Sequence, residues 1–433
     1  MAVNRVSRRN TMTQNALSVV TRIKAGEVNA LEAVLGQIGG DLTHNPLVPF
    51  PQFTTLHFAC WVVLKRDPNF PPCLVLETNF DGSLDAHLDE WFQLAAKGLH
   101  EVYSFCEGCP VETAPNSDSL RAYLMAHRVL ESAFYVGCYE RPLDVIQSAL
   151  ARRQAIEGFL DTQQPQRTLH NLSPAVVFAR IKTFLKTADA VPYTPSTPYK
   201  SLEMRSKMSM ALWVCGAILL LPFLLVFLLC YAPFLRQHEK REAATPGPTP
   251  LGVDPRLFGK EDIYVQNHLT TLTNVKPGAF RLRTLKGILW IINLLAKSVF
   301  ITGSLGGIPT IHFARWLLID QDKRLLFFSN YDGSWASYLG DFVDKANYGL
   351  TSVWSNTDNF PPTHFLFFGG AQHIEDFKAW SRRSNEYAAV WYSAYPDATV
   401  RNITEAVQIS ETFYGTLHGM PDDNEIAACL KKL

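Results

Sequence analysis

The apolar and polar positions of this chain follow one order of patterns twice. An alternating, β-branched stretch at Leu17–Gly26 ("LSVVTRIKAG") matches a second at Leu269–Gly278 ("LTTLTNVKPG"), and a helical pattern follows each. Apolar stretches then begin at Thr55 ("TLHFACWVVL") and at Thr310 ("TIHFARWLLI"). A period of two predicts strands and a period near 3.6 predicts helices. The repeat therefore predicts that the chain is an internal duplication.

A second pair of matching segments follows these strands. Leu74–Ser83 ("LVLETNFDGS") and Leu325–Ser334 ("LLFFSNYDGS") each read as a strand that ends in Asp-Gly-Ser before an amphipathic helix. A fourth strand is predicted in each half, at Leu120–Arg128 ("LRAYLMAHR") and at His364–Gly370 ("HFLFFGG"). Further on, "FYVGCYERPLDVI" aligns more loosely with "WYSAYPDATVRNI".

Each half thus has the order strand, helix, strand, strand, helix, strand, which is typical of a ferredoxin-like βαββαβ unit. Such a unit carries both helices on one face of a four-stranded antiparallel sheet, so the other face must be covered. A second copy of the sheet is the simplest cover. We therefore predict an α+β fold built from two ferredoxin-like units in tandem.

One segment differs from both units. Met208–Leu235 contains no charged residue and is longer than the roughly 20 residues that a helix needs to cross a bilayer core, so it predicts a membrane segment between the units. The predicted organisation is an N-terminal tail (1–14), a first unit (15–190), a linker (191–207), the membrane segment (208–235), a Pro-rich linker (236–262), a second unit (263–410) and a C-terminal tail (411–433).

Two topologies are open for the membrane segment. It is either a same-side hairpin broken near Pro222, or a full span that separates the halves, each of which then pairs with a partner chain in a homodimer. Basic residues flank the segment evenly, so the positive-inside rule does not decide. A second apolar stretch, Gly287–Ile308, is either the first helix of the second unit or a helix that also lies on the bilayer surface.

Charge and cysteine content narrow the class of protein. Lys plus Arg and Asp plus Glu both number 40 in 433 residues, and we find no basic patch, so a nucleic-acid partner is not expected. Eight cysteines are too few for a disulfide scaffold. Membrane lipid is the partner that the apolar segment indicates, at the cell membrane with the soluble units in the cytoplasm.

The repeated strands also carry the candidate chemistry. Antiparallel pairing brings the start of the second strand to the end of the third. The candidate residues at these strand ends are His57, Asn79 and Asp81 in the first half, and His312, Asn330 and Asp332 in the second. A histidine oriented by a carboxylate acts as a general base or as a metal or haem ligand. The alternative is structural, because Asp-Gly-Ser before a helix is an N-cap signal.

Arg315 is a further candidate, since it lies within a strand where the first half has Cys60. A charged side chain there needs a partner. That partner is either the carboxylate of a ligand, such as a haem propionate, or an acidic side chain of the protein.

In topology, residues 15–160 and 265–405 resemble the dimeric α+β barrel superfamily, whose fused members include chlorite dismutase-like and dye-decolourising peroxidase-like proteins. Asp81-Gly82 and Asp332-Gly333 match the end of the Gly-X-X-Asp-Gly signature of the latter, without its leading Gly. The resemblance implies haem as the cofactor, with His57 or His312 near it and Asn79 and Asn330 in its pocket.

Two classes of function remain. The first is a membrane-anchored, haem-dependent, peroxidase-like oxidoreductase in which His57, Asp81, His312, Asp332 and Arg315 act in catalysis. The second is a non-catalytic membrane-associated module that binds a lipid or a protein. An enclosed pocket at the histidines favours the first; a centre filled by side chains, with apolar patches beside the anchor, favours the second.

Overall fold

The computed structural model describes residues 14–110, 118–163, 172–187, 193–243, 250–259, 264–414 and 421–433. Most of the predicted N-terminal tail and parts of both predicted linkers lie outside these residues. The first half contains β1 (Gln14–Arg22), α1 (Val28–Gly40), a 3₁₀ turn η1 (Phe50–Gln52), β2 (Leu56–Leu64), β3 (Cys73–Asp81), α2 (Leu84–Tyr103), α3 (Asp118–Ala126), β4 (Ala133–Val136), α4 (Leu143–Gln163) and α5 (Pro174–Thr187).

Two helices and the second half follow. The helices are α6 (Tyr199–Leu219) and α7 (Leu221–Ala243). The second half contains η2 (Pro255–Gly259), β5 (Gln266–Asn274), α8 (Ala279–Ser298), β6 (Ile311–Ile319), β7 (Arg324–Asp332), α9 (Trp335–Lys345), α10 (Asn347–Trp354), β8 (Thr363–His364), β9 (Phe368–Gly369), η3 (Gly370–Gln372), α11 (Ile374–Ser384), β10 (Ala388–Ser393), α12 (Val400–Tyr414) and α13 (Asp423–Leu430).

The strands form two four-stranded antiparallel sheets, and the two halves exchange one strand each. The order is β1-β3-β2-β10 in one sheet and β4-β6-β7-β5 in the other. The segment before each exchanged strand is bonded to the sheet of its own half. Before β4, Val129 N donates to Ser18 O of β1 over 2.9 Å, and before β10, Glu386 N donates to Thr270 O of β5 over 2.8 Å. Both crossing segments therefore connect the two sheets through main-chain hydrogen bonds.

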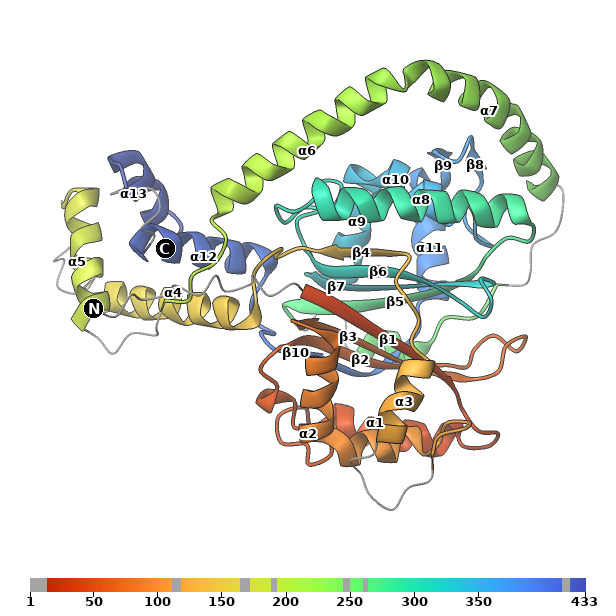
Figure 1. The fold of residues 1–433 in the computed structure, drawn as a ribbon, viewed down its shortest axis with the longest axis horizontal. Coiled ribbons are helices and arrows are strands. Elements are labelled where there is room, and N and C mark those ends of the chain that lie inside the picture. Colours follow the sequence, from red (N-terminus) through yellow and green to blue (C-terminus); the bar gives the residue numbers. More distant parts are fainter. Residues whose placement is uncertain are drawn as a thin grey trace, which may run out of the picture.

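The sheets lie face to face with helices outside them (Figure 1). Helices α1, α2 and α3 cover the first sheet, and α8 to α11 cover the second. Between the sheets, apolar side chains from both halves form one cluster, which includes Val62, Val75, Leu317 and Phe328. The expectation that each half covers the other's bare sheet face is confirmed.

Two predicted strands are wrong. Leu120–Arg128 contains helix α3, because Leu120, Tyr123 and Leu124 are buried at helical spacing. His364–Gly370 forms only the two-residue strands β8 and β9, which pair with each other. The fourth strands are instead β4 and β10, in the segments that aligned loosely.

Helices α4, α5, α12 and α13 form a separate lobe beside the sheets (Figure 1). Its centre is an apolar cluster with Ile156, Ile181, Phe413 and Ile426. The predicted C-terminal tail thus includes the end of α12 and all of α13.

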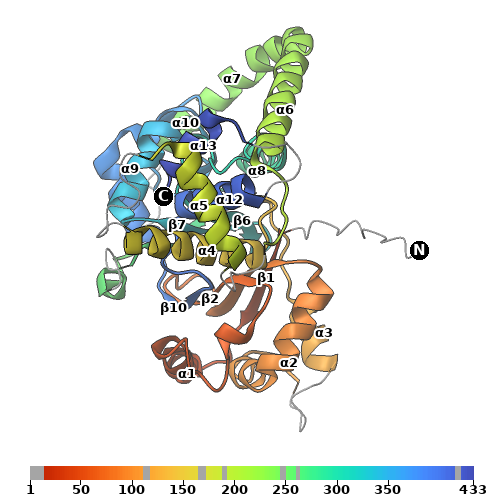
Figure 2. The same ribbon diagram turned by 90° about the vertical axis from the view of Figure 1, so that its left-hand side faces the viewer.

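Helices α6 and α7 form an arch that projects away from the sheets (Figure 2). The helix breaks at Leu220, and Pro222 lacks the N–H that a continuous helix would use there. At one end of the arch, Ser206 Oγ donates to Val299 O over 2.6 Å. At the other end, Tyr231 Oη lies 2.7 Å from Thr284 Oγ1. Both ends of the arch therefore rest on α8 or directly after it.

Candidate functional site

The His–Asp pairs form as the strand pairing predicts, and they are equivalent in the two halves. His57 Nε2 lies 2.9 Å from Asp81 Oδ1, and His312 Nε2 lies 2.6 Å from Asp332 Oδ1. The second oxygen of each carboxylate accepts a backbone N–H at the start of a helix. Asp81 accepts from Leu143 of α4 over 2.6 Å. Asp332 accepts from Val400 of α12 over 2.8 Å.

The Asp-Gly-Ser motif therefore caps two helices in each half. Ser83 Oγ accepts from Ala86 N at the start of α2, and Ser334 Oγ accepts from Ser337 N at the start of α9. The aspartate serves a different helix, 62 residues away in the first half and 68 in the second. Each aspartate therefore stabilises the first turn of a helix of the lobe, α4 in the first half and α12 in the second.

The two histidines do not fit an axial haem ligand. His57 is wholly buried, and its other ring nitrogen, Nδ1, lies 3.0 Å from Tyr395 Oη. His312 is 1% exposed, with its ring centroid 5.4 Å from that of Phe58 and 5.8 Å from that of Tyr395. The packed aromatic rings occupy the space beside both imidazoles that a porphyrin would need.

Arg315 lies at the centre between the sheets, and its partners come from the first half. Its guanidinium is 3.1 Å from Glu77 Oε1 and donates to Asn79 Oδ1 over 2.6 Å. It also donates to Leu17 O over 3.0 Å and to Thr78 O over 2.8 Å. Of the two partners considered for Arg315, the structure shows the acidic side chain.

The two asparagines belong to the same central network. Asn79 Nδ2 donates to Glu77 Oε1 over 3.0 Å. Asn330 Oδ1 accepts from Trp391 Nε1 over 2.9 Å and lies 2.9 Å from His268 Nδ1. Both amide oxygens are therefore engaged by protein groups.

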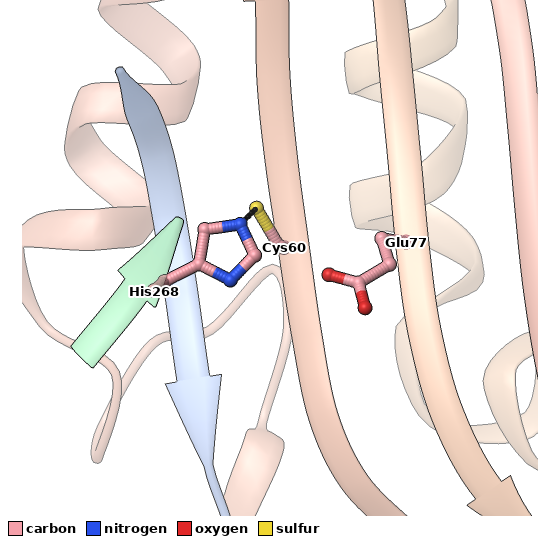
Figure 3. A group of neighbouring side chains, drawn as sticks. All are labelled: Cys60, Glu77 and His268. Atoms are coloured by element: carbon pink, nitrogen blue, oxygen red, sulfur yellow. Dashed lines mark hydrogen bonds between the residues drawn. The ribbon is translucent and has the colours of Figure 1, made fainter. Parts of the chain in front are cut away.

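Sequence reasoning missed three residues that meet in this network: Cys60, Glu77 and His268 (Figure 3). Cys60 Sγ lies 3.4 Å from His268 Nε2. One ligand atom from each of the three side chains lies within 4.8 Å of the others, in the only such group of His, Cys, Asp and Glu within the described part of the chain. The available signal was Glu77, a charged residue in the middle of a strand, directly after the apolar run Leu74–Leu76.

A cavity of about 470 Å³ opens beside His268. Asn267, Trp391 and Glu386 are among the residues that line it. Burial raises the pKa of the Glu386 carboxyl to about 7, although Arg66 lies 3.2 Å away and opposes the shift. The cavity combines apolar walls with a few polar groups, which is typical of small-ligand sites.

The most exposed apolar surface lies elsewhere, on the arch. Leu219, Phe223 and Leu229 are each at least 74% exposed. Among the described helices, α7 alone is long and apolar enough to cross a membrane, by the measures of length and composition. Trp290 and Ile291 on α8 are also exposed, at 61% and 45%.

Comparisons with family models, with curated proteins and with solved structures found no match to this chain.

Proposed function

We propose that this protein is a membrane-associated module whose α6–α7 arch inserts into one leaflet. The observation that carries the proposal is the position of the two ends of the arch against α8. A 20-residue helix is about 30 Å long, so the ends of the arch are held on one side of the molecule. Between them, the large apolar side chains of residues 218–229 are exposed, and lipid would remove them from water.

Further apolar and basic groups support the same orientation. Phe365, Phe367 and Phe368, in and around the β8–β9 hairpin, are 43–52% exposed. The hairpin is joined to α7 because Glu239 accepts from the backbone N–H groups of Phe365 and Leu366. Lys207 in α6 and Lys240 in α7 lie on either side of the apolar part of the arch, where their ammonium groups would meet lipid headgroups.

The finer description of the fold belongs to this proposal. We infer that the two sheets correspond to a pair of ferredoxin-like units joined as in the dimeric α+β barrels. The strand exchange supports this inference, since β4 and β10 each pair with a strand of the opposite half, while Val129 and Glu386, in the segments before them, bond to the sheet of their own half. The two sheets pair within one chain, so both halves lie on the same side of a membrane. This favours a same-side hairpin for the membrane segment over a span that separates the halves.

Of the two function classes, the geometry favours the non-catalytic one. The centre between the sheets is filled by Arg315, Glu77 and Asn79, and the histidines are enclosed by aromatic rings. No observation tests haem binding directly, and one absorption spectrum of protein expressed with haem precursor would do so. Because the geometry favours the non-catalytic class, we expect no Soret band.

The test of membrane insertion is flotation of the full-length protein with liposomes in high salt. The wild type is expected to float. A variant with Phe223→Asp and Leu229→Asp is expected to stay in the dense fraction. Leu130→Asp, which changes an apolar residue 68% exposed outside the arch, should float like the wild type. Equal flotation of the arch variant and the wild type would contradict the proposal.

The single-leaflet topology has its own test. Cys215 and Cys230 are exposed on the arch, whereas the other six cysteines are buried. A fluorophore on either thiol should be quenched by lipids that carry a quencher in the acyl chain. Protease added outside sealed vesicles should then digest both halves or neither. Protection of one half alone would show a full span.

A further inference from the structure

We propose that Cys60, Glu77 and His268 bind one divalent transition-metal ion of the zinc type between the two sheets. Thiolate, imidazole and carboxylate are the three ligand types that Zn²⁺ takes in proteins. Ligand atoms around a tetrahedral Zn²⁺ lie about 3.4 to 3.8 Å apart. The 3.4 Å between Cys60 Sγ and His268 Nε2 fits that spacing, and the carboxylate of Glu77 faces the same point (Figure 3).

The second oxygen of Glu77 is an independent indication. Glu77 is 1% exposed, and its Oε2 atom has no hydrogen-bond partner within the described residues. Oε1, in contrast, accepts from Asn79 and pairs with Arg315. A buried carboxylate oxygen without a donor is costly, and a bound cation would satisfy it.

The charge balance permits an ion beside Arg315. Glu77 and Glu131 both lie near this guanidinium, at 3.1 and 4.0 Å, so the two carboxylates and the one guanidinium carry a net charge of about −1. Coordination adds the ion's two positive charges, and the Cys60 thiol loses its proton to solvent as the sulfur–metal bond forms. The group is then neutral.

The three ligands occur once, although the fold is duplicated. Cys60 pairs with Glu77 across β2 and β3, and the equivalent pair in the second half is Arg315 and Phe328. His268 lies opposite Asn330, as Ala16 lies opposite Asn79. The His–Asp pairs, which cap helices, recur in both halves. The fold that the two halves share therefore does not explain why Cys60, Glu77 and His268 meet, because the equivalent positions elsewhere in the duplication carry other residues.

The surroundings of His268 suit a ligand. Its Nδ1 lies 2.9 Å from Asn330 Oδ1, which fixes the ring and leaves Nε2 toward Cys60. Nε2 also lies 2.8 Å from Thr270 Oγ1, a contact that the ion would replace. His268 also lines the 470 Å³ cavity, which gives the ion a way in and leaves room for a fourth ligand.

The site would join the two halves, since Cys60 and Glu77 come from the first and His268 from the second. The test is a Co²⁺ titration of the reduced, full-length, detergent-solubilised protein. We expect one Co²⁺ per chain, with a thiolate-to-cobalt charge-transfer band that Zn²⁺ abolishes. Either ion should raise the melting temperature of the wild type.

Cys60→Ala and His268→Asn are expected to lose the band and the thermal shift. Cys73→Ala is the matched control, because Cys73 is a buried thiol of the same sheet outside the group. Should either ligand variant fail to fold, His268→Gln serves as a third, because it leaves the buried Glu77–Arg315 pair intact, and it is expected to weaken Co²⁺ binding at least tenfold. The absence of a band in the wild type, or its full retention in a folded ligand variant, would overturn the proposal.

Discussion

Glu77 and Arg315, one from each half of the duplicated chain, form an ion pair 3.1 Å long at the centre between the two sheets. Both side chains are at most 2% exposed. Removal of one partner from such a pair leaves a buried charge without its counter-ion, which typically costs about 3 to 5 kcal/mol. We therefore expect Arg315→Leu to lower the free energy of unfolding by that amount in chemical denaturation.

The double variant Glu77→Leu with Arg315→Leu separates ion pairing from packing. Replacing a whole buried pair by apolar side chains is often neutral, so the double variant should recover most of the loss. A double variant that is less stable than the single one would contradict this account. It would show that Glu77 stabilises the fold through contacts other than this ion pair, such as the hydrogen bond that it accepts from Asn79.

Substitution of Asp81 and Asp332 tests whether the two His–Asp pairs have a structural role. Asp81→Ala and Asp332→Ala each remove a helix cap and the partner of a buried histidine, so each should lower the free energy of unfolding by about 2 to 4 kcal/mol. The two losses should be similar, because the contacts are the same in both halves. Thermal denaturation measures them.

The neighbouring serines are the control for these variants. Ser83→Ala and Ser334→Ala remove only an N-cap and should cost about 1 kcal/mol each. If one aspartate variant were as stable as the wild type while the other was not, the equivalence of the two sites would be wrong.

The strand exchange predicts a sharp difference between two glycines of α1. A Cβ at Gly39 would lie 2.3 Å from Ala389 O in β10, the strand that the second half contributes, whereas a Cβ at Gly36 would meet nothing within 4 Å. Gly39→Ala should therefore destabilise the chain by about 2 kcal/mol. Gly36→Ala should stabilise it by about 0.5 to 1 kcal/mol. Equal effects in urea denaturation would argue against this strand position.

The duplication and the order of elements could be predicted because burial on one face leaves a period in the sequence. The exchange of β4 and β10 could not, since a period shows which face of a strand is buried and not which strand it pairs with. The meeting of His57 with Asp81 followed from hairpin geometry. The second role of Asp81, as the cap of α4, depends on a contact 62 residues away that has no local signal.

The group of Cys60, Glu77 and His268 lay beyond sequence reasoning for a similar reason. Cys60 and Glu77 are cross-strand neighbours, and Glu77 was visible as a charge within a strand. His268 reaches them from the opposite sheet. Its position depends on how the two sheets face each other, which no pattern within either half specifies.

Glu386 predicts how stability depends on pH. Burial raises its pKa to about 7 in the folded chain, whereas the carboxyl titrates near its ordinary value of about 4.3 when the chain unfolds. Between these values the folded chain retains a proton that the unfolded chain has released. The contribution of Glu386 to the free energy of unfolding is therefore complete below about pH 4, falls as the pH rises toward about 7, and is lost above it.

Glu386→Gln removes the titrating group and leaves an amide beside Arg66. Relative to the wild type, this variant should be more stable at pH 8 by up to about 3 kcal/mol and similar near pH 4. Urea denaturation across this range measures the difference. Glu375→Gln, which changes an exposed carboxyl on α11, should follow the wild-type curve. Parallel curves for the wild type and Glu386→Gln would mean that Glu386 titrates alike in the folded and the unfolded chain, and would contradict the raised pKa.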